Sequence, residues 1–443
     1  MSLRLYWLSW TLLASLVALT PAASAQQVVP PATDLPELLT LDAALATFRA
    51  RGLDLLIAEA TIKGVEGQVG VAGAVPNPVV NGAWGHVLGS YSPDCDGCSS
   101  TYWSVGLSDS AAIEDSISGK RSLRVEVVRN ALAAAKMSRA DAERTIAFQV
   151  RSAYLQVAQA ALGYKFAKEI AETNAKTLDL FQTRFRSGAI NEGDLARIET
   201  QKLEADQARD QATQALRQSR VALAFLIGVR GVVADFDVDT KVLNFAEPSS
   251  LSGATEVSLL RTAFEHRPDL VAVGYQKASA EAQIALSKRQ RFPDITLGVN
   301  YSQLGTGQNA LSPPLITVGV SLPVPIFYQM QGEVKQAEAQ YDTNSLQQAK
   351  TTALVVSDVS GGYAAYDSSR KLVQRMETGG LLKSAKTARD ITRLQYEKGA
   401  ASLTDFLDAQ RTYIATNVEY FQDLAGYWTA VFQLEQAVGV ELH

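Results

Sequence analysis

The sequence predicts a mixed α/β membrane protein made of two similar halves, each with a pair of β-strands and a long helical hairpin. Three observations lead to this prediction. The 443-residue chain begins with the pattern of an export signal. The same order of short motifs occurs twice along the chain. Long alanine-rich stretches without proline alternate with strand patterns that have one apolar and one polar side.

The composition argues against nucleic-acid binding and against a site for metal or nucleophilic chemistry. The formal net charge is −5, which offers no basic surface for nucleic acid. Three histidines and two cysteines are a small supply of metal ligands and nucleophiles for a chain of this length. We therefore expect no enzyme activity, no metal site, no cofactor and no nucleic-acid partner.

Residues 1–25 are predicted to be a signal peptide. They contain a basic start, an apolar run over 5–19 and the small residues Ala23-Ser24-Ala25 that signal peptidase recognises, so the mature chain would begin at Gln26. A retained membrane anchor is the alternative, but the apolar run is short for a membrane span and a proline-rich segment follows it. After this segment no apolar run is long enough for a transmembrane helix.

Cys95 and Cys98 lie in the polar segment YSPDCDGCSS. An even number of cysteines in an exported chain favours a disulfide between them. A redox or metal-binding CxxC pair is the alternative, although the sequence places no further zinc ligands nearby.

Short motifs recur at a nearly constant spacing, which predicts an internal duplication. Asp54-Leu55 matches Asp269-Leu270 at an offset of 215 residues. The segment FRSGAINEGDL (185–195) matches YEKGAASLTDF (396–406) at an offset of 211 residues. Each match is weak alone, but the matches keep the same order across nearly the whole mature chain.

Each predicted repeat contains a helical segment, a β-hairpin and a long helical hairpin, in that order. The first repeat covers 26–235, with a helical segment at 39–74, a β-hairpin at 78–110 and a helical hairpin at 119–228. The second repeat covers 254–443, with a helical segment at 254–290, a β-hairpin at 293–323 and a helical hairpin at 325–438. Residues 236–253 connect the two repeats.

The predicted strands alternate between apolar and polar side chains. In DITLGVNYSQ the apolar set is Ile295, Leu297, Val299 and Tyr301. A soluble sheet with one buried face shows the same alternation, and so does a transmembrane barrel, which the export signal favours here. A bacterial barrel needs at least about eight strands, whereas this chain offers four. If the strands span a membrane, several chains must share one barrel.

The helical hairpins are predicted to be long coiled coils. No proline interrupts Gly119–Arg186, and none follows the first position of Pro325–Tyr396. At about 1.5 Å per residue, an unbroken helix of about 70 residues is a rod of about 100 Å, which is too long for a compact domain. Apolar and small residues recur at three-four spacing in the helices that follow, as in coiled coils. Gly188 and Gly399 mark the bends of the two hairpins.

Asp405 and Asp408 lie one helical turn apart just after the bend at Gly399, so their carboxylates point the same way. The local interpretation is ordinary helix chemistry, in which a glycine ends one helix and acidic residues stabilise the N-terminus of the next. A functional role for the pair is the alternative.

These features together resemble the TolC-type outer-membrane efflux family, over essentially the whole mature chain. The segments GKRSLR (119–124) and SLPVPIFYQMQGEVKQAE (321–338) are similar to the branch that serves heavy-metal resistance-nodulation-division pumps. The resemblance implies a homotrimer with a 12-stranded β-barrel in the outer membrane, four strands per chain. It also implies an α-helical coiled-coil tunnel across the periplasm, with an equatorial belt formed by the connector.

The resemblance further implies a function and a set of partners. The protein would be the passive outer-membrane channel of a tripartite efflux system, conducting metal cations or drugs. Its partners would be a periplasmic adaptor protein, an inner-membrane resistance-nodulation-division pump and the lipid of the outer membrane. The turns at Gly188 and Gly399 would be the tips that contact the adaptor.

Four residues match gating positions of the family. Asp405 and Asp408 match the acidic pair of the periplasmic gate, where symmetry would repeat each of them three times. Tyr396 and Asp194 match a latch between neighbouring helices. The sequence departs from the family pattern at Ala401, where better-known members carry an arginine that makes a second latch.

Two other functions remain open at this point. A type I protein-secretion conduit has the same fold, and the sequence does not separate it from an efflux channel. A trimeric adhesin or envelope scaffold would share the export signal and the coiled coils, but it gives no reason for duplicated strand pairs between the helices. Neighbouring genes for a pump and an adaptor would discriminate between these functions.

Overall fold

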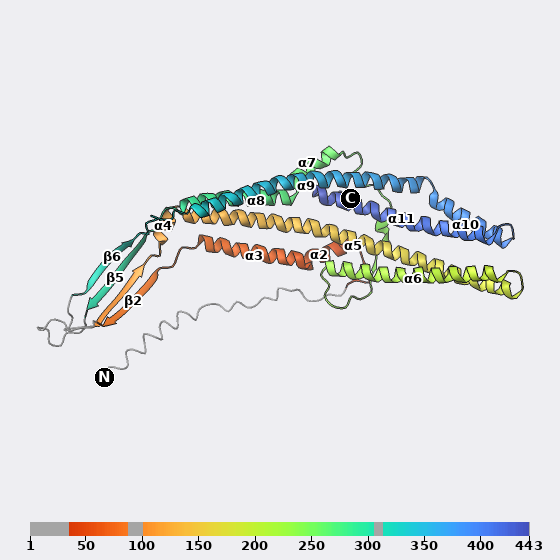
Figure 1. Cartoon of the computed structure of the whole chain (residues 1–443), viewed down its shortest axis with the longest axis horizontal. Coiled ribbons are helices and arrows are strands. Elements are labelled where there is room, and N and C mark those ends of the chain that lie inside the picture. Colours follow the sequence, from red (N-terminus) through yellow and green to blue (C-terminus); the bar gives the residue numbers. More distant parts are fainter. Residues whose placement is uncertain (1–34, 87–100, 305–312, 443) are drawn as a thin grey trace, which may run out of the picture.

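The structure is a computed structural model that describes residues 35–86, 101–304 and 313–442. The predicted signal peptide 1–25 and the predicted disulfide residues Cys95 and Cys98 lie outside the described residues. The molecule is elongated, with a β-sheet at one end and two helical turns at the other (Figure 1).

The first half begins with short elements and ends with a long helical hairpin. Its elements are β1 (Leu38–Leu39), α2 (Leu41–Arg51), α3 (Leu53–Gly73), β2 (Val79–His86), β3 (Thr101–Ser108), α4 (Ala112–Ile117), α5 (Lys120–Arg186) and α6 (Glu192–Leu226). The predicted helix over 39–74 is therefore two helices, which meet at Gly52. A Cβ at Gly52 would lie 2.6 Å from the ring of Phe48, so only glycine allows this close join.

The second half has the same order of long elements. The connector before it holds β4 (Asp237–Val238) and the 3-10 helix η1 (Thr240–Leu243). The second half contains α7 (Glu256–His266), α8 (Pro268–Arg289), β5 (Thr296–Leu304), β6 (Leu315–Ser321), α9 (Gln331–Thr378), α10 (Leu381–Glu397) and α11 (Leu403–Val438). The predicted helix over 254–290 is again divided, here before Pro268, whose fixed φ and missing N–H suit the first position of α8.

The two long arms differ. The first arm, α5, is one uninterrupted helix of 67 residues, as predicted. The second arm begins at Gln331 and is divided into α9 and α10, so the expectation of one rod over Pro325–Tyr396 is wrong. The division falls at Gly379 and Gly380, and Gly380 has a φ of +61°, which an L-residue in a right-handed helix does not adopt.

The sheet is antiparallel throughout, in the order β2-β3-β5-β6. Its register places most of the large apolar side chains on one face, as the alternation predicts. One apolar row across the four strands is Val80, Leu107, Val299 and Val318, and the neighbouring row on the other face is Asn81, Gly106, Asn300 and Thr317. The apolar face is exposed in the single chain, since Trp84 is 75% and Val318 71% exposed. This face is unlike the buried face of a soluble sheet.

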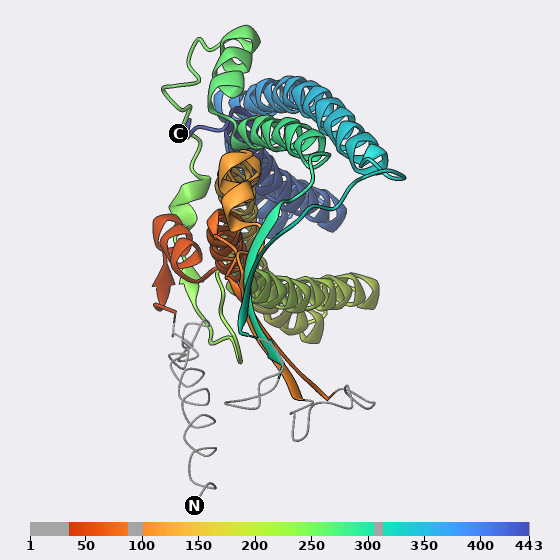
Figure 2. The same ribbon diagram turned by 90° about the vertical axis from the view of Figure 1, so that its left-hand side faces the viewer.

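Viewed from the sheet end, the long helices lie side by side, with α2 and the connector on one side of them (Figure 2).

Tyr154 of α5 binds the short strands β1 and β4 at the middle of the molecule. Its buried hydroxyl donates to the carbonyl of Leu39 at 2.9 Å and accepts from the N–H of Asp239 at 3.0 Å. It therefore holds β1 and β4, which pair in parallel, against the first long arm. The predicted connector thus packs on the helices.

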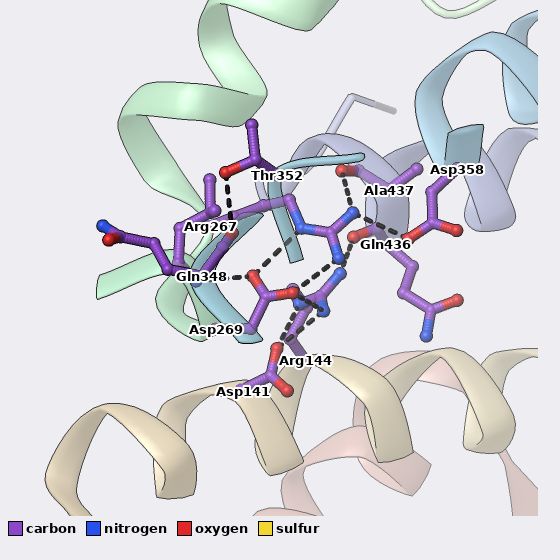
Figure 3. A network of polar contacts seen from close by, with 10 residues as sticks. Asp141, Arg144, Arg267, Asp269, Gln348, Thr352, Asp358, Gln436 and Ala437 are labelled. Atoms are coloured by element: carbon purple, nitrogen blue, oxygen red, sulfur yellow. Dashed lines mark hydrogen bonds and ion pairs between the residues drawn. The ribbon is translucent and has the colours of Figure 1, made fainter. Parts of the chain in front are cut away.

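A network of charges around the buried Arg267 joins the two halves near the C-terminal end of α11 (Figure 3). Arg267, which is 3% exposed, donates to both carboxylate oxygens of Asp269 at 3.0 and 2.6 Å, to Asp358 at 2.9 Å and to the carbonyl of Ala437 at 3.2 Å. Arg144 of the first half donates to the carbonyl of Gln436. Such charge-assisted hydrogen bonds are stronger than neutral ones, and they fix the geometry where the halves meet.

Burial alone would raise the pKa of the Asp269 carboxyl, but the hydrogen bonds and the charge of Arg267 outweigh burial and hold this pKa below its usual value. The carboxylate therefore stays ionised inside the network.

Within the described part of the chain, no helix combines the length and the apolar character that crossing a membrane requires.

Candidate functional site at the helical tips

The two turns far from the sheet have the same backbone geometry. Gly188 has a φ of +75° and Gly399 a φ of +76°. In both turns the glycine N–H donates to the carbonyl three residues earlier, and the next N–H donates to the carbonyl five residues earlier, at 2.8 to 3.0 Å. This pattern is the Schellman motif, which strongly favours glycine at the left-handed position. The bends predicted at these two glycines are confirmed.

The helices after the turns also start in the same way. In the first tip, the side-chain oxygen of Asn191 accepts from the N–H of Asp194 at 2.8 Å, and its amide donates to the Asp194 carboxylate at 3.0 Å. In the second tip, the Ser402 hydroxyl oxygen accepts from the N–H of Asp405 at 3.1 Å, and the N–H of Ser402 donates to the Asp405 carboxylate at 3.1 Å. Asp194 and Asp405 therefore occupy equivalent positions of the two tips.

Asp405 belongs to a capping box, which satisfies two backbone donors at the start of α11. The hydrogen bonds from the side chain and backbone of Ser402 hold the pKa of the Asp405 carboxyl below its usual value. The structure thus shows the role that the local interpretation gives Asp405, which is to stabilise the N-terminus of α11.

Asp408 differs from Asp405. Both side chains are exposed, and they lie away from the buried residues of the same helix turn, such as Phe406. Within the described residues of one chain, however, the Asp408 carboxylate makes no hydrogen bond or ion pair. The equivalent position of the first tip holds Arg197, which lies 4.0 Å from Asp194. An acid at position 408 is therefore not required by the geometry of the tip.

A small apolar core holds the two tips of one chain together. It combines Phe181 and Ile198 of the first hairpin with Leu403, Phe406 and Leu407 of the second. Tyr396 extends this core, because its ring stacks on Phe181 at 5.6 Å and on Phe406 at 6.0 Å between centroids. The two hairpins are therefore fixed side by side near their ends.

Tyr396 and Asp194 lie on different hairpins of this joined tip. Burial raises the pKa of the Tyr396 hydroxyl above its usual value, Arg184 opposes the rise, and the charge of Asp194 adds to it. The structure thus brings the two residues into the same electrostatic environment, but within the described residues of one chain no hydrogen bond joins them. The sequence analysis missed Arg184, which lies 6.0 Å over the Tyr396 ring. In the sequence, Arg184 is marked only as a basic residue in the last turn of a predicted helix, where such residues are common.

A hollow of about 790 Å³ lies nearer the sheet, where α3, α5, α8 and α9 run together. Its lining is mostly small or uncharged and polar, and includes Thr61, Ala131, Ser138, Gln276, Ser279, Gln283 and Asn344. One charged residue, Arg139, also lines the hollow, and its guanidinium is paired with Glu59 and Glu143. Among the residues that the structure describes, no cluster of three or more His, Cys, Asp or Glu side chains could hold a metal ion.

Comparison with known proteins places these features in a family. A family model described as "Outer membrane efflux protein" matches residues 44–229 and 259–440. The chain is 22% identical over 412 residues to the cobalt-zinc-cadmium resistance protein CzcC of Cupriavidus metallidurans, with 90% of each chain covered. It is 26% identical over 451 residues to the pyoverdine export outer membrane protein OpmQ of Pseudomonas putida, covering 93% of this chain and 91% of the relative. A crystal structure of CusC has the same fold, with a TM-score of 0.71 at 18% identity, covering 95% of this chain and 99% of the other.

Proposed function

The chain belongs to the outer membrane efflux protein family, and from this membership we propose that three copies close one twelve-stranded barrel and continue it as a helical tunnel. The protein is an outer-membrane efflux channel that reaches into the periplasm. The observation that supports the shared barrel is the sheet itself. Among the described residues it has four strands, an exposed apolar face and two edges, β2 and β6, that pair with no further strand. In lipid, unpaired backbone groups at an edge cost several kcal/mol each, so an open sheet of this kind requires further copies.

Conduction in this proposal is passive. The hollow beside α5 offers small and polar side chains to a solute, and the energy comes from an inner-membrane pump. A periplasmic adaptor joins that pump to the channel. The turns at Gly188 and Gly399 are the proposed contact points for the adaptor, because they are the ends of the molecule farthest from the sheet (Figure 1).

The substrates named for the relatives indicate the kinds of solute that this channel would export. One relative is named for cobalt, zinc and cadmium resistance and another for pyoverdine export. Likeness to the former supports a heavy-metal resistance-nodulation-division pump as the partner. We infer that the pump, and not the channel, selects the substrate, since the described residues of this chain contain no cluster of His, Cys, Asp or Glu side chains that could select a metal ion.

The gate proposal assigns Asp405 and Asp408 to a constriction at the tips. Three copies would bring two rings of three carboxylates into a narrow space, which disfavours full ionisation and favours a bound cation. Exposure of both side chains and the lack of a partner for Asp408 within one chain support this assignment. Tyr396 and Asp194 form the proposed latch between the two hairpins, whose tips the apolar core around Phe181 and Phe406 holds side by side.

Light scattering of the purified mature protein in detergent tests the shared barrel. The expected mass is about three times that of the 47.6 kDa chain, after correction for detergent and for the cleaved signal. In cells, deletion of the gene should lower the export of the pump's substrate, and the intact gene should restore it. A stable monomer with full β content would contradict the proposal.

A further inference from the structure

Arg184 lies in the last turn of α5, beside the bend at Gly188, and its side chain is half-buried. The centre of its guanidinium lies 6.0 Å from the centre of the Tyr396 ring on the other hairpin, which is within the range of a cation–π contact. Within the described residues this guanidinium makes no ion pair, whereas Arg197 of the same tip lies 4.0 Å from Asp194. An arginine without a carboxylate partner therefore faces the tyrosine of the proposed latch.

The packing of α5 fixes where Arg184 meets the tyrosine. Phe181 and Arg184 are three residues apart, which places both side chains on the same face of the helix. Phe181 stacks on the Tyr396 ring at 5.6 Å between centroids, with an angle of 7° between the ring planes. Phe406 stacks on the same ring at 6.0 Å. The Tyr396 ring is held by two other rings, so its hydroxyl has a fixed direction relative to Arg184.

The carboxylate of Asp194 is fixed in the same tip by the start of α6. Asn191 accepts from the N–H of Asp194 at 2.8 Å and donates to its carboxylate at 3.0 Å. Burial is the largest influence on the pKa of the Tyr396 hydroxyl and raises it. Arg184 lowers this pKa through its charge and its N–H groups, and the charge of Asp194 raises it. The hydroxyl of Tyr396 therefore lies close enough to both charged groups to respond to each.

The chemistry of these three side chains allows only one order of hydrogen bonds. A guanidinium can only donate, an ionised carboxylate can only accept, and a phenol does both. We propose that Arg184 is a positioning residue of the gate, which donates to the Tyr396 oxygen and directs the hydroxyl hydrogen toward Asp194 when the tips close. This inference rests on the proposed function, and it adds a third member to the latch.

The chain of hydrogen bonds has a physical advantage over a tyrosine and an aspartate alone. Each of its two bonds includes a charged group, and such bonds are stronger than neutral ones. Each bond also polarises the next, so the loss of the arginine weakens the bond between Tyr396 and Asp194. Arg184 therefore acts on the gate through the tyrosine hydroxyl.

The alternative role of Arg184 is general to the last turn of a helix, where a basic side chain stabilises the negative end of the helix dipole. Arg186 shares this last turn, and its side chain is exposed. Its Nε donates to the carbonyl of Gln182 at 3.3 Å. A comparison of the two arginines separates a role in the latch from a role in the helix.

Single-channel recording of the trimer in planar bilayers tests the role of Arg184. Arg184→Ala should raise the ratio of open to closed time at least about twofold, the smallest coupling typical of residues in one hydrogen-bond network. Arg184→Lys keeps a charged donor but not the planar fork, so its ratio should lie between those of Arg184→Ala and the wild type. Arg186→Ala should leave the ratio unchanged.

A double-mutant cycle shows whether Arg184 acts through the hydroxyl. Arg184→Ala combined with Tyr396→Phe should give a ratio close to that of Tyr396→Phe alone, because the acceptor of the arginine is already absent. The inference would be overturned by effects that multiply in the double variant, or by an Arg186→Ala effect as large as that of Arg184→Ala. A raised ratio in Tyr396→Phe beside an unchanged ratio in Arg184→Ala would overturn it as well.

Two further outcomes separate this inference from the proposed function. An unchanged ratio in Tyr396→Phe would remove the latch and the inference with it, while the channel itself would stand. A wild-type protein that is monomeric by light scattering, or that does not conduct, would contradict the proposed function instead. If Arg184→Ala does not assemble into trimers, Arg184→Lys and its combination with Tyr396→Phe provide the same comparison.

Discussion

The carboxylate of Asp405 accepts hydrogen bonds from both the N–H and the hydroxyl of Ser402, at 3.1 and 2.7 Å. This contact gives Asp405 a structural role within one chain, whereas Asp408 has no such role in the described part of the molecule. The two acids of the proposed gate are therefore separable by experiment, since one of them also caps a helix and the other does not.

Asp408→Ala should weaken the block of conductance by divalent or trivalent cations from the periplasmic side, without a change in thermal stability. The physical reason is that removal of one ring of three carboxylates lowers the affinity for cations, while the capping box remains. Single-channel recording in planar bilayers measures the block, and thermal unfolding in detergent measures stability. If the double change of Asp405→Ala with Asp408→Ala keeps the wild-type block, the two residues are only first-turn acids.

Ser402→Ala is the matched control for the gate. It removes the cap and keeps both carboxylates, so it should lower the stability of the tip, with a typical cost for a lost serine cap of about 0.5 to 2 kcal/mol. Cation block should stay close to that of the wild type. A loss of block as large as in Asp408→Ala would assign the effect to the shape of the tip and not to charge.

Tyr396→Phe should raise the open fraction of the channel without changing ion preference. The substitution keeps the stacking on Phe181 and Phe406, and it removes only the hydroxyl proposed to reach Asp194 on the other hairpin. Tyr396→Ala should additionally lower thermal stability, because it leaves a cavity in the apolar core of the tip. Equal conductance of Tyr396→Phe and wild type would remove the tyrosine from the latch.

Local patterns in the sequence were enough to locate the turns and the faces of the strands. A glycine followed by a capping residue and an acid three positions later determines its own geometry, so Gly188 and Gly399 could be identified from sequence alone. The alternation in β5 and β6 predicted the two faces of these strands, because the backbone of a strand itself sets the period of two residues. The less regular strand over 79–86 still places Val80 and Trp84 on the apolar side.

Features that depend on distant parts of the chain were not predicted. Arg267 binds Asp358 and the carbonyl of Ala437, which are 91 and 170 residues away in sequence. A periodic pattern of apolar residues does not indicate a contact between side chains so far apart in sequence. The break at Gly379 and Gly380 was missed for another reason, since a search for proline alone overlooks adjacent glycines, which also interrupt a helix. Arg184 was missed because its role depends on a tyrosine of the other hairpin.

Arginine substitution on the two faces of β5 should have opposite outcomes. Val299→Arg places a charge on the apolar, lipid-facing side, and near the middle of a bilayer this costs about 2 to 4 kcal/mol. Asn300→Arg places the charge on the polar side, where water is present in the proposed barrel. The yield of heat-resistant oligomers in membranes measures assembly. Equal loss of assembly in both variants would mean that the face exposed in the single chain is not the lipid face.

Acid should weaken the joint between the two halves through Asp269. The pKa of this carboxyl is lowered in the folded protein. Its contribution to stability is therefore fully present above the pKa of an unfolded aspartate, about 3.9. That contribution is lost as the pH falls through the folded pKa. Asp269→Asn removes the charge at every pH, and it should lower the melting temperature at neutral pH. It should also flatten the decline of the melting temperature as the pH falls below about 4. Glu204→Gln, on the exposed side of α6 and away from the network, is the control and should leave the decline unchanged. A decline as steep in Asp269→Asn as in the wild type would assign acid sensitivity to other carboxylates.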